Sequence, residues 1–288
     1  MTRAPCHAVP RVRPGRAGRQ PGGHALPGAD TVISVVVEAT VGATRDNQLR
    51  SAAGVLRAYG YQLITQLWSR TSEFGPPPRP AGVRAYTLGN FSDLQRAQLV
   101  ARGMQMLDEG STDRLEPAAA ETARLQVQHL YQRRHRRLGF VAPGTADEAA
   151  VAERLVEIDK AAAELGIGPV EVQVLNPANR RAATVRDWWE LGVTAVIAFD
   201  DDTAATVAGA ALRAGLSIPA DLAVIGHGDS TTAEVFHPSL TSIRIDDHRM
   251  GEHLAAVILS RLQGRPLPPP PRAIATVAAR ESTMIARA

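Results

Sequence analysis

Short apolar runs alternate with amphipathic stretches from residue 32 onward. The apolar runs, which predict buried strands, are residues 33–37, 61–67, 138–142, 170–175, 194–199 and 222–225. The stretches with helical spacing are a helix with Leu49, Ala52, Ala53 and Leu56 on one face, and residues 118–131, 147–165, 181–190 and 203–214. Strands that alternate with helices in this way are typical of an α/β protein with parallel sheets.

Helix boundaries and loops follow from individual residues. Gly60, Gly166 and Gly215 end three of the predicted helices, and Asp202 is a candidate N-cap for the helix at 203–214. The proline-rich segments 75–80 and 266–271 predict loops or extended connectors, because proline fits neither a helix interior nor a central strand.

The first 30 residues differ from the rest in composition. They contain five glycines and five prolines, which predicts a disordered tail. The tail also holds five arginines, all before Asp30, and the net charge of the whole chain is +3, so residues 30–288 carry a net charge of −2. The folded part is therefore not expected to be a basic, DNA-coating surface.

Length and residue usage narrow the class of protein. A chain of 288 residues is long enough for two domains. Cys6 is the single cysteine, which excludes an internal disulfide and a multi-cysteine zinc site. The sequence has neither an apolar run of membrane-spanning length nor a secretory signal, and we expect a cytoplasmic protein.

An acidic cluster follows one of the buried strands. Asp200, Asp201 and Asp202 lie at its carboxyl end, where ligands of open α/β sheets bind. A magnesium-dependent phosphatase with Asp200 as nucleophile is one interpretation. Ala204 stands where such enzymes carry threonine or valine, so helix capping and hydrogen bonding are better supported. We expect no enzyme activity, cofactor or metal.

Two other features have ordinary structural interpretations. His248 and His253 are five residues apart, which does not suit a metal pair on a helix, and predicts solvated histidines. At most one of Trp188 and Trp189 can face the core of the predicted helix. The other is then half-exposed, or contacts a partner.

Three linked motifs resemble the lactose-repressor (LacI/GalR) family of regulators. They are residues 194–204 (TAVIAFDDDTA), 213–226 (RAGLSIPADLAVIG) and 237–244 (HPSLTSIR). The resemblance extends over roughly residues 31–285. It implies a periplasmic-binding-protein-like core with two Rossmann-like parallel-sheet subdomains. The implied division is 31–137 plus 247–265 for the first subdomain and 138–246 plus 266–288 for the second.

The same resemblance implies an effector site between the subdomains. Its expected residues are Arg154, Asp200, Glu121, Thr44, Arg45, His227 and Asp229. Without the resemblance, the sequence also allows Arg154 to pair with Glu153 or Glu157 on the helix surface. The family has two acids after its Gly-aromatic pair, whereas this chain has Gly228 and then Asp229. A sugar, a nucleoside or a small anion is the expected effector, and Arg45 with Arg154 would suit a carboxylate or phosphate.

The resemblance implies a transcriptional regulator whose DNA binding rests on the family alone. Residues 1–30 show no pair of capped helices that would form a helix-turn-helix, so no DNA-binding residue is identified. A homodimer is implied too, although the segment between Leu67 and Ala81 is too short for the helix that the family places there. The alternative is a stand-alone cytoplasmic small-molecule-binding protein.

Overall fold

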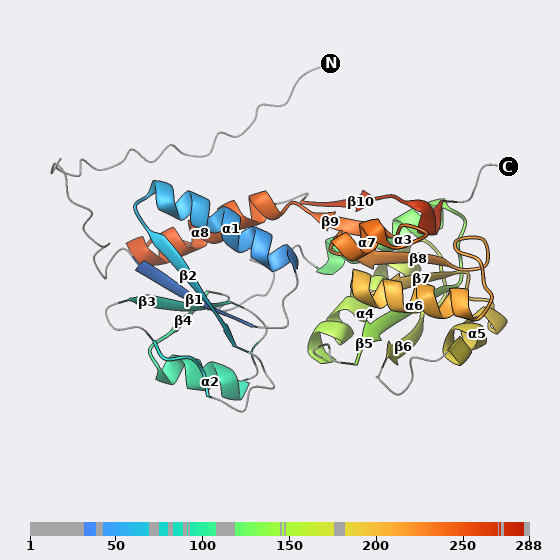
Figure 1. Cartoon of the computed structure of the whole chain (residues 1–288), viewed down its shortest axis with the longest axis horizontal. Helices are drawn as coiled ribbons and strands as arrows, with labels where there is room; N and C mark the ends of the chain where they lie inside the picture. The colour runs from blue at the N-terminus through green and yellow to red at the C-terminus, as the bar shows by residue number, and fades with distance from the viewer. Residues whose placement is uncertain are drawn as a thin grey trace, which may run out of the picture.

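The computed structural model shows two lobes side by side (Figure 1). The described residues are 32–38, 43–68, 75–79, 83–88, 91, 93–107, 119–144, 146, 148–175, 182–269, 271 and 274–284. The tail predicted to be disordered, residues 1–30, lies outside them. No helix in these ranges combines the length and the apolar character that a membrane crossing requires.

The first lobe contains a four-stranded parallel sheet in the order β2-β1-β3-β4. Its strands are β1 (Val32–Glu38), β2 (Gln62–Trp68), β3 (Arg84–Leu88) and β4 (Gln105–Met106). Helices α1 (Ala43–Ala58) and α8 (Asp247–Gln263) cover one face, and α2 (Asp93–Ala101) covers the other. Strand β1 alternates between them, with Val35 facing α1 and α8 and Val36 facing α2.

Helices α1 and α8 cross at very short range. Gly251 lies where they touch, and a Cβ there would be 2.4 Å from Ser51 Cβ and 2.5 Å from Gln48 O. At the start of α8, Asp247 accepts hydrogen bonds of 3.3 Å from both Asn47 and Gln48. The crossing joins segments that are about 200 residues apart in the chain.

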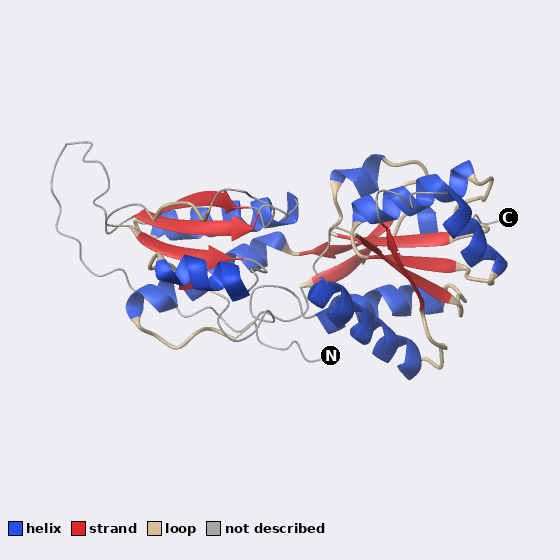
Figure 2. Cartoon of the chain, turned by 90° about the horizontal axis from the view of Figure 1, so that it is seen from below, coloured by secondary structure: helices blue, strands red, loops and turns tan. Residues whose placement is uncertain are grey.

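The second lobe contains a six-stranded sheet in the order β10-β9-β8-β7-β5-β6. Its parallel strands are β5 (Leu138–Pro143), β6 (Glu171–Leu175), β7 (Ala195–Ala198), β8 (Ala223–His227) and β9 (Thr241–Ile245), and β10 (Ala275–Ala278) is antiparallel. Helices α3 (Ala119–Gln132) and α4 (Glu148–Glu164) cover one face, and α5 (Ala182–Glu190) and α6 (Asp201–Arg213) the other. Figure 2 shows the helices on both sides of this sheet. Two short elements, α7 (Thr231–Val235) and the 3₁₀ helix η3 (Glu281–Thr283), complete it.

The carboxyl ends of both sheets face the junction between the lobes. Strand β9 ends at Ile245, and α8 of the other lobe begins at Asp247, so the carboxyl ends of the parallel strands β5–β9 lie beside the first lobe. Asp247 in turn contacts the amino-terminal half of α1, which follows the carboxyl end of β1. The strand-end loops of the two lobes therefore face each other across the junction.

The predicted fold class is confirmed by the two parallel sheets and their helices. The predicted strands and helices are found within a few residues of their expected bounds, and the described parts of both proline-rich segments are loops. The subdomain division stays a prediction. Helix α3, which lies ahead of the expected boundary at residue 137, packs in the core of the six-stranded sheet.

Two local predictions are wrong. Helix α6 begins at Asp201 and is capped by Asp200, so Asp202 lies in its first turn instead of capping it. His253 is buried, because α8 turns that face toward the first lobe's interior, whereas His248 is exposed as expected. The expectation for the tryptophans is confirmed: Trp188 is buried, and Trp189 is 46% exposed.

Candidate functional site

The strand order of the second lobe reverses between β5 and β7. Strand β5 connects through α4 to β6 on one side, and β7 connects through α6 to β8 on the other. The loops after two such strands diverge, and the space outside their carboxyl ends is the usual ligand site of open α/β sheets. Phe199 and Asp200 follow β7 there.

Arg154 extends from α4 toward the end of β7. Its guanidinium carbon is 5.8 Å from the centre of the Phe199 ring, within range of a cation–π contact. Glu157, a possible partner named above, accepts a 2.6 Å hydrogen bond from Lys160. The contact with Phe199 places the Arg154 charge at the end of β7.

His227 ends β8, beside Arg154. Burial and the Arg154 charge together lower the pKa of His227 to about 3. The imidazole is therefore neutral at physiological pH, and it offers one hydrogen-bond donor and one acceptor. Two of the predicted effector residues, Arg154 and His227, are thus brought together by the fold.

Asp200 serves as the N-cap of α6. Its Oδ1 accepts a 2.7 Å hydrogen bond from Thr203 N, and its backbone is extended, as this role requires. No residue in the described part of the chain is bonded to Oδ2. Asp200 follows Phe199 directly, so it lies at the same strand end as Arg154.

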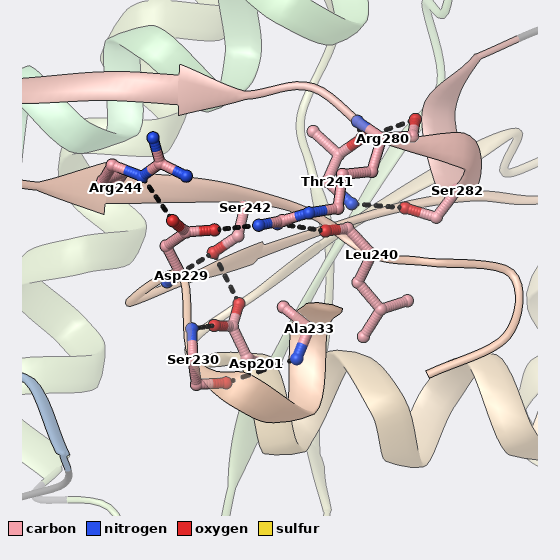
Figure 3. Close-up of polar contacts among 10 residues, drawn as sticks. All are labelled: Asp201, Asp229, Ser230, Ala233, Leu240, Thr241, Ser242, Arg244, Arg280 and Ser282. Atoms are coloured by element: carbon pink, nitrogen blue, oxygen red, sulfur yellow. Dashed lines mark hydrogen bonds and ion pairs between the residues drawn. The ribbon is translucent and has the colours of Figure 1, made fainter. Parts of the chain in front are cut away.

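Asp229 lies in the loop after β8 and is held by two arginines (Figure 3). Its Oδ1 accepts a 2.6 Å bond from Arg280 Nη2, and its Oδ2 accepts a bond from Arg244 Nε. Burial alone would raise the pKa of Asp229, but the bonds from Arg244 and Arg280 hold it below its usual value. The backbone has φ of +49°, which is uncommon for a residue with a side chain.

Asp201 forms a second, buried part of the same network (Figure 3). Its two oxygens accept a 2.7 Å bond from Ser230 N and a 2.6 Å bond from Ser242 Oγ. Burial raises the pKa of Asp201, and the bonds from Ser230 and Ser242 only partly offset this. Gly226 leaves room for the carboxylate, because a Cβ there would be 2.2 Å from Asp201 Oδ1.

The three consecutive aspartates do not converge on one point. Asp200 caps a helix, Asp201 points into the protein, and Asp202 is exposed. Among the described residues, no group of three or more histidine, cysteine, aspartate or glutamate side chains is placed to hold a metal ion. This geometry gives no support to the phosphatase interpretation.

The remaining predicted residues are less well defined. Glu121 lies half-buried in the first turn of α3, and within the described residues no hydrogen bond or ion pair joins it to the other predicted residues. Thr44 and Arg45 belong to the first turn of α1, and their side chains lie outside the described residues. Because α1 begins near the junction, their backbone positions suit the predicted role.

Sequence reasoning did not identify Gln126 or the role of Arg280. Gln126 is fully buried in α3, and its Nε2 donates to Gly226 O at 3.0 Å and Ala198 O at 3.4 Å. It thus joins the ends of β7 and β8, while its Oε1 has no partner among the described residues. For Gln126, the only signal in the sequence was a glutamine among the apolar positions of a predicted helix. Arg280 lies within the region of the family resemblance, but its partner Asp229 is 51 residues away.

Comparison with known proteins shows one family match. A model described as "Periplasmic binding protein-like domain" matches residues 127–283, which is more than half of the chain. The HTH-type transcriptional repressor PurR of Photobacterium profundum is 25% identical over 163 residues, covering 54% of this chain and 47% of the relative. The regulator CelR of Thermobifida fusca is 29% identical over 151 residues, covering 51% and 44%. The chain therefore spans about half the length of these curated relatives.

Solved structures show the same fold across both lobes. A Lac repressor dimer bound to operator and an anti-inducer has a TM-score of 0.68 at 16% identity, covering 89% of this chain and 95% of that one. A CelR–cellobiose complex has a TM-score of 0.67 at 20% identity, covering 89% and 86%. At these identities the likeness concerns the fold alone.

Proposed function

The chain belongs to the periplasmic-binding-protein-like domain family, in the form that LacI-type regulators use to bind effectors, and on that premise we propose that it senses a small molecule between its two lobes. The observation that carries the proposal is the shared direction of the sheets, whose carboxyl ends both face the junction. Loops at such ends converge from two sides on one ligand.

Ligand binding between the lobes would be coupled to their relative position. The chain passes from β9 to α8 across residue 246, and returns from α8 to β10 through residues 264–274. A ligand that contacts both lobes stabilises the arrangement in which both sets of contacts form. Binding of the effector would therefore be converted into a change in lobe closure.

We expect the effector to carry an anionic group. Arg154 supplies a charged fork, whereas His227 is neutral and both oxygens of Asp229 are taken by arginines. Arg45 would add a second guanidinium if its side chain faces the junction. Asp200 Oδ2 remains to accept a hydrogen bond from a hydroxyl or amino group of the ligand.

The test is a thermal-shift screen of neutral sugars, nucleosides, carboxylates and phosphorylated sugars. At least one anionic compound should raise the melting temperature of the wild-type protein, and Arg154→Gln should abolish that rise. Arg50→Gln removes an exposed arginine from α1 and serves as the matched control. Stabilisation by neutral sugars alone would refute the anionic class and leave effector binding intact. Stabilisation by none of the four classes would count against the sensing role itself.

Regulation of transcription is proposed for the native protein on the strength of its relatives. The matched proteins carry names of transcriptional repressors and regulators, and one solved structure holds operator DNA. Sequence-specific retardation of promoter DNA by protein from its own host, with a steep salt dependence, would support this function. Ligand stabilisation without any DNA binding would favour the stand-alone small-molecule-binding protein. We propose that the protein acts in the cytoplasm, where promoter DNA is located.

We further propose a homodimer formed through the first lobe. Exposed apolar side chains lie on both faces of the edge strand β2 and at the end of α1, with Leu67 68% exposed, Tyr59 47% and Ile64 40%. A groove of about 360 Å³ lies beside Tyr59, lined by residues 53, 57 and 60–63. Exposed apolar side chains on an edge strand favour association with another chain. Leu67→Glu should convert the dimer to a monomer in sedimentation, whereas Val100→Glu on α2 should not.

A further inference from the structure

A strongly basic turn lies at the end of the second lobe away from the junction. Residues 133–137 read Arg-Arg-His-Arg-Arg and connect α3 to β5. The turn is well defined: His135 N donates to Leu130 O at 3.1 Å, and Arg134 adopts φ of +69°. This hydrogen bond and backbone geometry are those of a common helix C-terminal motif.

Two of the four arginines donate hydrogen bonds to backbone carbonyl groups of the same chain. Arg133 Nη1 donates to His129 O at 3.3 Å, and Arg136 Nη1 donates to Tyr131 O at 2.9 Å. The Arg136 guanidinium also lies 3.8 Å from the centre of the Tyr131 ring. Both cations therefore satisfy carbonyl groups at the negative end of α3. Burial, together with Arg133 and Arg136, lowers the pKa of His135, so the positive charge resides on the arginines.

Arg134 and Arg137 are exposed and have no anionic partner within the described part of the chain. Arg137 lies against the turn after α5, where its Nη1 is 3.3 Å from the position that a Cβ of Gly192 would occupy. Thr194 N donates to Arg137 O at 3.0 Å, which fixes the two turns side by side. Glu190, in the last turn of α5, is exposed and forms no ion pair with either arginine in this region.

The end of α5 and the turn after it present exposed apolar side chains next to Arg137. Trp189 is 46% exposed and Leu191 is 51% exposed, and Gly192 N donates to Trp189 O at 2.9 Å. Trp188 is buried and anchors the helix, so Trp189 is held outward on a rigid element. Tryptophan and arginine are the residues most often found at the energetic centres of protein interfaces.

We propose that Arg134, Arg137, Trp189 and Leu191 form a docking surface for an acidic, partly apolar peptide segment of a partner protein. Carboxylates of the partner would bind the two guanidinium groups, and an apolar side chain would pack on Trp189 and Leu191. A protein segment fits better than nucleic acid. The surface has a single indole instead of a series of stacking rings, and residues 30–288 carry a net charge of −2.

The position of the surface makes it independent of effector binding. Helix α5 lies at the far end of the second lobe from α1 and α8 (Figure 1). A partner bound there would leave the carboxyl ends of the strands uncovered. The surface is therefore a second site on the chain, and its existence does not depend on the proposed sensing function.

The test uses a fluorescein-labelled synthetic peptide of about 15 residues, with glutamate at every third or fourth position and leucine between. Fluorescence anisotropy measures its affinity for the full chain at about 50 mM and about 300 mM salt. The matched probes are the same peptide with glutamine for glutamate, and a labelled single-stranded DNA of similar length. Binding of the glutamate peptide should weaken at high salt, and the glutamine peptide should bind at least about tenfold more weakly.

The variants assign the binding to this surface. Arg134→Glu/Arg137→Glu should weaken peptide binding by about tenfold or more, and Trp189→Ala by several-fold. Arg134→Gln/Arg137→Gln should give a smaller loss of the same sign. Arg50→Glu/Arg249→Glu makes the same charge change at exposed positions of α1 and α8 and should leave affinity within about twofold. Circular dichroism melting would verify that each variant is folded.

Three results would overturn the proposal. The first is the absence of measurable peptide binding at low salt. The second is binding that Arg134→Glu/Arg137→Glu leaves unchanged. The third is tighter binding of the DNA than of the glutamate peptide, because this would make the surface a nucleic-acid site.

Discussion

Replacing Asp229 with asparagine tests the two-arginine clamp most directly. The substitution keeps the shape of the side chain but removes its charge. Arg280 is the partner that matters more, because its side chain is 18% exposed, against 60% for Arg244. A hydrogen bond to a charged group contributes about 1.5–3 kcal/mol when it is shielded from water. An exposed ion pair contributes about 0–1 kcal/mol.

We therefore expect Asp229→Asn to lower the free energy of unfolding by about 2–3 kcal/mol at pH 7. For a protein of this size that corresponds to a drop in Tm of about 4–10 °C. Urea denaturation at pH 7 gives the free energy, and thermal melting followed by circular dichroism gives Tm. Asp202→Asn removes an exposed carboxylate from α6 and is the control, with an expected change under about 1 kcal/mol.

The pH dependence provides an independent measure of the same clamp. The folded-state pKa of Asp229 is depressed, so its stabilising effect is present above the ordinary carboxyl pKa and is lost as pH falls through the lower folded value. The stability difference between wild type and Asp229→Asn should thus shrink in acid.

A double-mutant cycle separates the contributions of the two arginines. The coupling of Asp229→Asn with Arg280→Met should exceed its coupling with Arg244→Met by about 1 kcal/mol or more. Equal couplings, or a loss under about 1 kcal/mol for Asp229→Asn alone, would show that the clamp is not a significant source of stability.

Three further predictions concern other parts of the molecule. Gly251→Ala should lower stability by about 1–3 kcal/mol in urea denaturation, because the new Cβ meets backbone of α1 that cannot move aside; an unchanged midpoint would contradict the close crossing. The pKa of Asp201 is raised by burial, so its protonated form is favoured in the fold and its effect on stability becomes unfavourable as pH rises above about 4. Asp201→Asn should accordingly reduce the decline in stability between about pH 4 and pH 7, and a steeper decline in the variant would refute this. Trp189 is the exposed tryptophan of the described residues, so Trp189→Phe should remove most acrylamide quenching of fluorescence, whereas Trp188→Phe should not.

The sequence by itself determined the order and type of the main elements. Local periodicity decides these, and α4 shows why: its apolar residues recur at helical spacing, and Ile158 and Ala162 of that stripe are buried as the pattern requires. The same local information placed Asp200 at the end of β7, because position relative to a strand end can be read from the chain, whereas Arg154 was expected only from the family resemblance.

The exact start of a helix could not be predicted from the local sequence alone. Asp200, Asp201 and Asp202 are equivalent as caps by residue type alone. The structure makes Asp200 the cap because Asp201 is drawn inward by Ser230 and Ser242, which belong to other elements. Similarly, His253 is buried within α8, whose packing against α1 joins segments far apart in the chain.

Only the tertiary structure decided how the polar residues are used. Asp229 looked like a ligand for the effector, yet both its oxygens are engaged by Arg244 and Arg280, which come from β9 and from the segment after β10. Gln126 joins carbonyl groups that are 72 and 100 residues away in sequence. Hydrogen bonds and ion pairs need atoms within about 3 Å, and closeness of that kind between distant segments is set by the packing of sheets and helices. A sequence pattern records which side chains are available, and the fold determines which of them meet.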